Sequence, residues 1–268
     1  MILYYFTKWW KTRCGDYMYK GRTDLAIEDM ELSYVYEIDK KINGMYLKKC
    51  NVDKKLSEKI GKDEGIYYNL DNIDYYTKDS EIVKIASGVI KDLINGLDNI
   101  RDILVVGLGN PNITPDSLGP LVINKIEVNR HLEDNFRYSV SAISPGVMGQ
   151  TGMESSEIIK AIVDDFKPDL VIVVDALACS DPSRMCTSIQ LSTAGINPGA
   201  GIGNNRKKLA KSTLGCEVIA IGIPTVTDIN VFTDEIENDY YVTPNNIDEA
   251  MDILSGIIAR SINSAVIG

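Results

Sequence analysis

The sequence predicts an α/β fold, a twisted and mainly parallel sheet with helices on both faces. The apolar run DILVVGLG (Asp102–Gly109) ends in glycine, which is typical of a strand buried on both faces. Two similar runs follow, DLVIVVDALA (Asp169–Ala178) and EVIAIGIPT (Glu217–Thr225). Segments with helical spacing lie between the runs, and this alternation of strands and helices favours a parallel sheet covered on both faces.

Hydrophobic periodicity predicts the remaining elements in chain order. Within residues 31–80, a less regular part, two strands are expected at MYLKKCNV (Met45–Val52) and GIYYNL (Gly65–Leu70). Two more are expected at RYSVSAISP (Arg137–Pro145) and TSIQLST (Thr187–Thr193), the latter with alternating faces. Apolar residues at helical spacing predict helices over Glu81–Leu97, Ser117–Leu132, Glu154–Phe166 and Asn245–Ile262.

Composition narrows the class of protein. The 268 residues carry a net charge of −10, which disfavours direct binding to nucleic acid. No apolar run approaches the roughly 18 residues of a membrane span. Five cysteines without a CxxC pair indicate a reducing cytoplasm. Because His131 is the single histidine, catalytic and metal sites that need two histidines are excluded. We therefore expect no metal, cofactor or membrane partner.

The first 21 residues differ from the rest of the chain. They are rich in aromatic residues, and their four basic residues against one acidic residue give them a net charge of +3. The remainder therefore carries −13. This asymmetry favours a leader packed on an acidic body, and an unstructured or misassigned start is the alternative.

Two aspartates follow strands of the predicted sheet. The carboxyl ends of such strands are where sites form in open α/β sheets. Asp175 closes an apolar strand, where burial would raise its pKa. Asp116 lies in the otherwise uncharged loop between Gly107 and Pro120, where it could also cap the next helix. Two such carboxylates could share a proton, one acting as base on water and the other as acid to the leaving group.

Neighbouring loops supply candidate groups for binding substrate or an oxyanion. Gly199, Gly201 and Gly203 leave backbone N–H groups accessible, and Arg206 could bind a carboxylate or pair with the aspartates. Asn110, in GLGNPN, is a further candidate. This motif is not a dinucleotide fingerprint, because Asn112 stands where the third glycine is required. Cysteine catalysis would need His131 to reach Cys179 or Cys186, and nothing in the sequence places it there.

Five blocks resemble, in order, those of the germination proteases of spore-forming bacteria. The resemblance extends over about residues 22–268 and implies a fold similar to that of hydrogenase-maturation proteases. It also implies two essential aspartates, Asp116 and Asp175, and small acid-soluble spore proteins as substrates in the cytoplasm of the spore core. A tetrameric zymogen that removes its own N-terminal segment is implied as well. The blocks are VVGLGNPNITPDSLGP, SAISPGVMGQTGMESSEII, KPDLVIVVDALA, STAGINPGAGIGNNRKKL and GCEVIAIGIPTVTDI.

The segment TDLAIE (Thr23–Glu28) looks like a processing site of this family, which cuts between an acidic and an apolar residue. The expected scissile bond joins Asp24 to Leu25. Residues 1–24 would then be a propeptide and residues 25–268 a single α/β protease domain. Alternatively, Thr23 or Asp24 only caps the first ordered element.

Two other functions are compatible with parts of the sequence. VGLGNP also opens the peptidyl-tRNA hydrolases, but their histidine follows that motif closely, whereas His131 lies well beyond it. A non-catalytic relative that only binds spore proteins is the second alternative. It is suggested by the short stretch between Ile229 and Val242, which is longer in the family.

Overall fold

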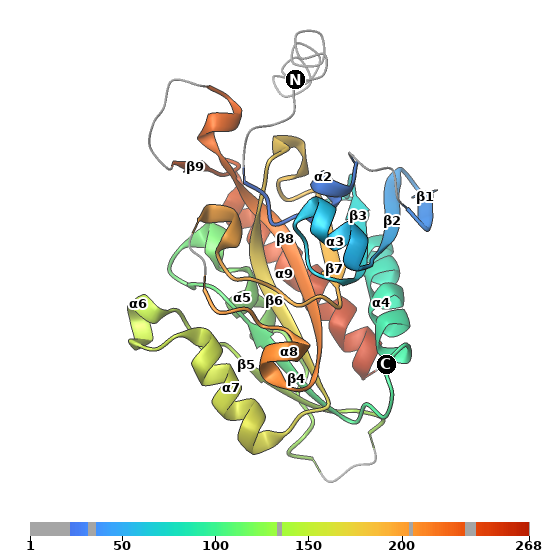
Figure 1. Ribbon diagram of the computed structural model, residues 1–268, viewed down its shortest axis with the longest axis vertical. Coiled ribbons are helices and arrows are strands. Elements are labelled where there is room, and N and C mark those ends of the chain that lie inside the picture. The colour runs from blue at the N-terminus through green and yellow to red at the C-terminus, as the bar shows by residue number, and fades with distance from the viewer. Residues whose placement is uncertain (1–21, 32–35, 133–135, 204–205, 234–239, 268) are drawn as a thin grey trace.

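The computed structural model describes residues 22–31, 36–132, 136–203, 206–233 and 240–267. The basic leader, residues 1–21, lies outside the described residues. Across the described ranges nine strands form one sheet, in the order β1-β2-β3-β7-β8-β6-β4-β5 with β9 on β8 (Figure 1). The strands are β1 (Ile38–Ile42), β2 (Met45–Val52), β3 (Gly65–Asp71), β4 (Asp102–Gly107), β5 (Ser139–Ile143), β6 (Leu170–Cys179), β7 (Ser188–Ser192), β8 (Glu217–Asp228) and β9 (Tyr241–Val242).

Helices connect and cover these strands. The helix α3 (Lys54–Ile60) begins after Asp53, whose side chain accepts the Leu56 N–H. It ends at Gly61, which has the left-handed conformation. Short 3-10 turns include η1 (Thr114–Asp116) and η3 (Ala200–Ile202). The helices are α2 (Ala26–Glu31), α3 (Lys54–Ile60), α4 (Asp79–Asn95), α5 (Leu118–Ile123), α6 (Met148–Thr151), α7 (Ser155–Phe166), α8 (Lys211–Leu214) and α9 (Ile247–Val266).

The sheet has a parallel half and an antiparallel half that meet at β8. Strands β5, β4, β6 and β8 are parallel to one another. Strand β7 pairs with β8 in the antiparallel sense, and β3, β2 and β1 continue that pattern outward. The predicted α/β fold is confirmed. It carries, in addition, an antiparallel extension that includes the strands expected within residues 31–80.

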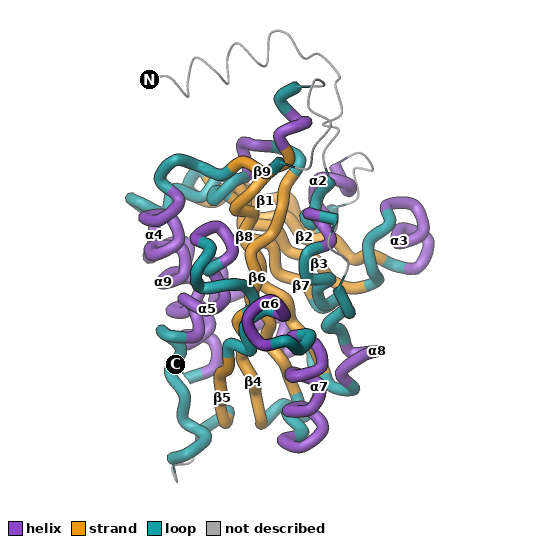
Figure 2. Tube along the Cα trace, turned by 90° about the vertical axis from the view of Figure 1, so that its left-hand side faces the viewer, coloured by secondary structure: helices purple, strands orange, loops and turns teal. Residues whose placement is uncertain are grey.

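Side chains along the parallel strands alternate between the two faces of the sheet, so the core has two layers. Ile103 and Val105 of β4 pack with α4, α5 and α9, whereas Leu104 and Val106 pack with α7 and α8. The tube view shows the two groups of helices on opposite sides of the sheet (Figure 2). Both faces are therefore apolar, which accounts for the uninterrupted apolar runs of β4 and β6.

The helix predicted over Ser117–Leu132 is wrong beyond Ile123, where α5 ends. The residues after it bond to other elements instead of continuing the helix. The Glu127 N–H donates to Asn263 of α9, and the Asn129 side chain bonds to Tyr138 and Val140 at the start of β5. These tertiary bonds outweigh the weak helical preference of the β-branched residues in this stretch.

Candidate active site

Asp175 lies within β6, which does not close there as expected but continues to Cys179, and it is 5 % exposed. Its Oδ1 accepts the N–H of Ala176 at 2.9 Å. Burial raises the pKa of Asp175 well above its ordinary value, and the negative charges of Asp116 and then Asp24 raise it further. A proton is therefore retained on this carboxyl group at pH values where an exposed aspartate is ionised.

Asp116 ends η1 and faces back toward the loop that follows β4. Its Oδ2 accepts the Asn110 N–H at 2.8 Å, so it does not cap α5. Gly109, with φ of +115°, allows this approach, because a Cβ there would collide with the Asp116 backbone. Burial raises the pKa of Asp116, while the Asn110 bond and the Arg206 charge oppose that increase.

The two aspartates line one cavity of about 360 Å³, which we call the aspartate cavity. It brings together several groups that come from distant parts of the sequence. Its polar lining includes Asp24, Asp116, Asp175 and Arg206, and its apolar lining includes Ile113 and Ile202. Two carboxylates with unequal surroundings, one buried and one half-buried, can divide the roles of acid and base between them.

Asp24 is held against the carboxyl end of β6. Its N–H donates to the Ala178 carbonyl at 3.0 Å. Its carboxylate accepts two backbone N–H groups, that of Ala178 at 2.9 Å and that of Gly201 at 2.7 Å. Burial raises the pKa of Asp24, and both hydrogen bonds oppose that increase. The side chain is therefore bound by the protein body rather than by the start of α2.

Gly201 makes this approach possible. A Cβ at Gly201 would stand 2.7 Å from the Asp24 Cγ, closer than two carbon atoms can pack. Thr23 fits the alternative in which it caps the first ordered element. Its Oγ1 accepts the Leu25 N–H at 3.0 Å just before α2 begins.

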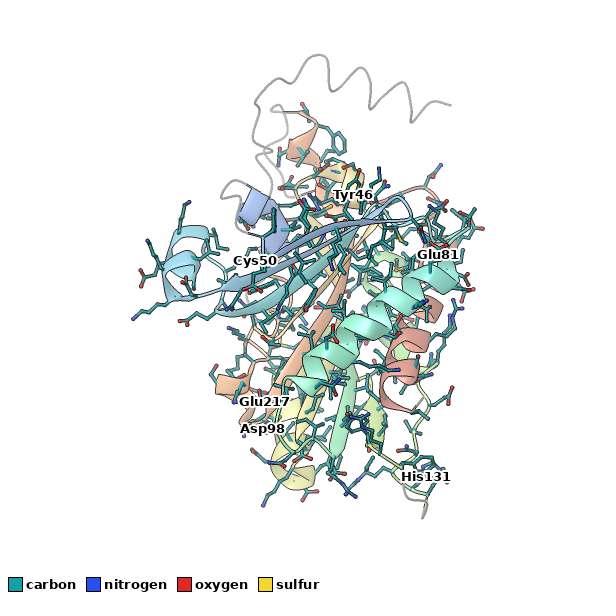
Figure 3. The ribbon with its side chains drawn as sticks, turned by 90° about the vertical axis from the view of Figure 1, so that its right-hand side faces the viewer. Tyr46, Cys50, Glu81, Asp98, His131 and Glu217 are labelled. Atoms are coloured by element: carbon teal, nitrogen blue, oxygen red, sulfur yellow. The ribbon has the colours of Figure 1, made fainter. Side chains whose placement is uncertain are left out.

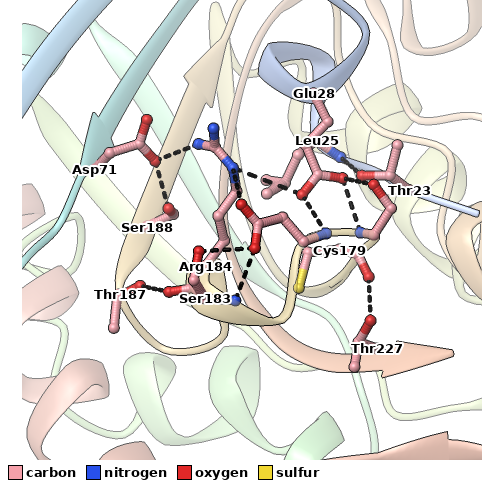
Figure 4. Close-up of polar contacts among 12 residues, drawn as sticks. Thr23, Leu25, Glu28, Asp71, Cys179, Ser183, Arg184, Thr187, Ser188 and Thr227 are labelled. Atoms are coloured by element: carbon pink, nitrogen blue, oxygen red, sulfur yellow. Dashed lines mark hydrogen bonds and ion pairs between the residues drawn. The ribbon is translucent and has the colours of Figure 1, made fainter. Parts of the chain in front are cut away.

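The residues after Asp24 are also fixed to the body. Leu25, Ala26 and Ile27 are buried. Glu28 accepts hydrogen bonds from the Ser180 N–H at 2.8 Å, the Ser180 hydroxyl at 2.6 Å and the Asp181 N–H at 2.9 Å. The Nε of Arg184 lies 3.6 Å from Glu28, and the same guanidinium bonds to Asp71 (Figure 4).

Gln190, on β7, contacts the main chain on both sides of the Asp24–Leu25 bond. Its Oε1 accepts the Ala26 N–H at 2.7 Å, and its Nε2 donates to the Asp24 carbonyl at 3.4 Å. Sequence reasoning missed Gln190, Glu28 and Arg184. The sequence does not single out Gln190, since it is one of three polar residues that alternate with Ile189 and Leu191 along β7.

The other glycine and asparagine candidates have different positions. Gly199 lines the aspartate cavity. Gly203 ends η3 with its N–H on the Ala200 carbonyl and packs against the Arg22 guanidinium. Asn110 contributes its N–H to Asp116, while its side chain accepts from Gln150.

The structure does not bring His131 to the cysteines. His131 is exposed in a turn beside the start of β5, far down the sheet in Figure 3. Cys179 and Cys186 are buried, and burial raises the pKa of both thiols, that of Cys186 to about 12. Neither thiol has the surroundings of a reactive cysteine.

Among the residues that the structure describes, no group of three or more potential ligands among His, Cys, Asp and Glu is placed to hold a metal ion. No helix in this part of the chain has the length and apolarity to cross a membrane.

Residues 16–240 match a family model described as germination protease. The germination protease of Clostridium perfringens (strain SM101 / Type A) is 35 % identical over 313 residues, covering 93 % of this chain and 96 % of the relative. That of Bacillus subtilis (strain 168) is 39 % identical over 246 residues, covering 82 % and 67 %. The solved structure of the NiFe hydrogenase maturation protease HycI from Thermococcus kodakarensis KOD1 is similar to 65 % of this chain over 99 % of its own length. The TM-score is 0.39 at 19 % identity.

Proposed function

Because the chain belongs to the germination protease family and is therefore a peptidase, we propose that it is an endopeptidase that begins the degradation of small acid-soluble spore proteins. The observation that carries the proposed mechanism is a pair of carboxylates in one cavity, the buried Asp175 and the half-buried Asp116. Asp24, the residue before the expected processing bond, lines the same cavity. The position of Asp24 beside the two carboxylates supports cleavage of the bond that follows it.

The surroundings of the two carboxylates suggest how they divide the work. Asp175 holds the proton, because it is the more buried of the two and neighbouring negative charges oppose its ionisation. Asp116, supported by the Asn110 N–H and Arg206, is the ionised base. It removes a proton from water, whose oxygen attacks the scissile carbonyl carbon. Asp175 then gives its proton to the leaving nitrogen as the carbon–nitrogen bond breaks, so that a carboxylic acid and an amine are released.

We further propose that the chain is a zymogen that cuts its own Asp24–Leu25 bond. Residues 1–24 are then the propeptide and residues 25–268 the protease domain. The contacts of Asp24 with Ala178 and Gly201 support this, since they seat an acidic side chain at the edge of the aspartate cavity. Assembly into a tetramer and residence in the spore core follow from the family resemblance. Light scattering on the purified protein tests the tetramer.

One experiment tests both activities. The purified chain is incubated and its mass and N-terminal sequence are determined, and then a small acid-soluble spore protein is added. Wild type is expected to start at Leu25 and to cut the substrate, whereas Asp116→Asn and Asp175→Asn do neither. Cleavage by either variant at the wild-type rate contradicts the mechanism. Binding of the spore protein without turnover by wild type favours the non-catalytic alternative instead.

A further inference from the structure

The amide of Gln190 spans the bond that is expected to be cut. Its orientation follows from chemistry, because the Ala26 N–H can only donate and the group that it contacts at 2.7 Å must therefore be the amide oxygen. The amide nitrogen then faces the Asp24 carbonyl oxygen, at 3.4 Å. This carbonyl belongs to the Asp24–Leu25 peptide bond.

Sheet register puts Gln190 and Asp175 on the same face. Asp175 pairs with Gly222 of β8, and Gly222 pairs with Gln190 of β7. Side chains of paired residues point to one side of a sheet, and over Gly222, between the other two, lies the side chain of Leu177. Two strand spacings separate their backbones by about 10 Å. The Asp24 backbone crosses this interval, with its N–H on Ala178 of β6 and its carbonyl toward Gln190.

Three of the other candidate donors are already engaged. The N–H groups of Ala178 and Gly201 bond to the Asp24 carboxylate, not to its carbonyl. The Asn110 N–H bonds to Asp116. Among these groups, the Gln190 amide is the one directed at the oxygen that would take up charge during cleavage.

We propose that Gln190 Nε2 is the oxyanion donor of this peptidase and that its Oε1 aligns the bond by holding the Ala26 N–H. This inference rests on the proposed function. As water adds to the Asp24 carbonyl carbon, the carbonyl π electrons move to the oxygen, and the N–H···O contact shortens and strengthens. The oxyanion then collapses and expels the Leu25 nitrogen, which takes the proton of Asp175. A long ground-state contact is expected of a group that acts mainly in the transition state.

The test replaces the donor and keeps the acceptor. Gln190→Glu has the same shape and still accepts the Ala26 N–H, but it presents a carboxylate to the Asp24 carbonyl. Two rates are measured on the full-length chain, the appearance of the Leu25 N-terminus and the cleavage of a peptide copy of residues 20–31. A loss of about 10²–10³-fold in kcat is expected, as for other oxyanion donors. Asn51→Asp, at an exposed position of β2, is the matched control and should leave both rates unchanged.

The pH profile separates catalysis from mere positioning. Once protonated, the new carboxyl group can donate, so the ratio of Gln190→Glu to wild-type kcat should rise as the pH falls. Gln190→Met, which lacks donor and acceptor, should show no such rise. It also provides the kcat measurement if the added charge prevents folding. A raised KM with unchanged kcat, or a kcat within threefold of wild type in these variants, overturns the role of Gln190 alone. Failure of wild type to cut either bond overturns the proposed function, and this inference with it.

Discussion

At the scale of single residues, Asp175 carries an ionisable group that is only 5 % exposed to solvent. Its pKa is raised in the folded state by burial and by Asp116 and Asp24. The protonated form therefore contributes most to stability below the ordinary aspartate pKa of about 3.9. That contribution is lost as the pH rises toward the pKa of the folded state. It amounts to about 1.4 kcal/mol for each tenfold difference in proton affinity between the folded and the unfolded state.

Asp175→Asn should therefore stabilise the protein at pH 8 while abolishing cleavage. The increase in the free energy of unfolding should vanish below about pH 4, where wild-type Asp175 is protonated in both states. Urea unfolding at several pH values measures this. Asp116→Asn, which removes a less strongly perturbed group, should show a smaller gain. A variant less stable than wild type at pH 8 contradicts the raised pKa of Asp175 in the folded state.

Gly201 gives a second prediction at this scale. Gly201→Ala would bring a methyl group against the Asp24 carboxylate, with a carbon–carbon distance of 2.7 Å. The side chain must move out of its two N–H bonds, so the appearance of the Leu25 N-terminus should slow at least tenfold. Gly88→Ala is the control, because its Cβ meets nothing within 4 Å in α4, where alanine is favoured by about 1 kcal/mol. Equal processing rates in the two variants would contradict the recognition of Asp24 by Gly201.

At the scale of elements, the segment from Leu25 to Glu28 is bound to the body independently of the leader. Glu28 has a nearly buried side chain that accepts three hydrogen bonds from Ser180 and Asp181. The segment should therefore stay docked after the Asp24–Leu25 bond is cut. The N-terminus at Leu25 should resist an aminopeptidase, because Leu25 and Ala26 are fully buried.

Glu28→Gln tests this anchoring. Replacing a charged acceptor by a neutral one should lower the free energy of unfolding by about 2 kcal/mol, and it should expose the new N-terminus to trimming. The control, Glu37→Gln, breaks the exposed pair with Lys49 and should cost less than about 1 kcal/mol. Urea unfolding and mass spectrometry after aminopeptidase treatment provide the two readouts. Equal losses in the two variants would show that Glu28 is no anchor.

Most of these elements could be predicted from periodicity, because an apolar face has the same spacing wherever the element packs. The α4, α7 and α9 helices and strands β2 to β8 lie close to their predicted ranges. The end of the helix after Asp116 could not be predicted from periodicity, since Asn129 and Asn263 bind the following residues through bonds across the fold. The antiparallel direction of β7 was also beyond reach, because the spacing of side chains along a strand does not record its direction.

At the scale of the whole molecule, the candidate site lies at the junction of the two halves of the sheet. The parallel half supplies Asp175, and the antiparallel half supplies Gln190. The two aspartates could be proposed as a pair from the sequence, because Asp175 is a charged residue in an apolar strand and Asp116 is the one charged residue of its loop. Gln190 and Glu28 could not, since their partners lie more than 150 residues away. Only the folded chain brings those segments together.

The distance between the ends of the sheet gives the last prediction. The Arg130 N–H bonds to Val140, which is level with Ile103 and Leu170 at the start of the parallel strands. Asp175 lies five residues further along β6, or about 16 Å at 3.3 Å per residue. His131, next to Arg130 and exposed, cannot therefore share a substrate atom with the aspartates.

His131→Ala should accordingly leave the rate of processing within about twofold of wild type and the free energy of unfolding within about 0.5 kcal/mol. Neither protein should release peptide from peptidyl-tRNA, since the histidine that such an esterase needs is remote from the aspartate cavity. The rate of Leu25 formation and a peptidyl-tRNA release assay, run side by side, measure both. If wild type releases peptide and His131→Ala does not, then the chemistry lies at the opposite end of the sheet. The pair of aspartates would then require another explanation.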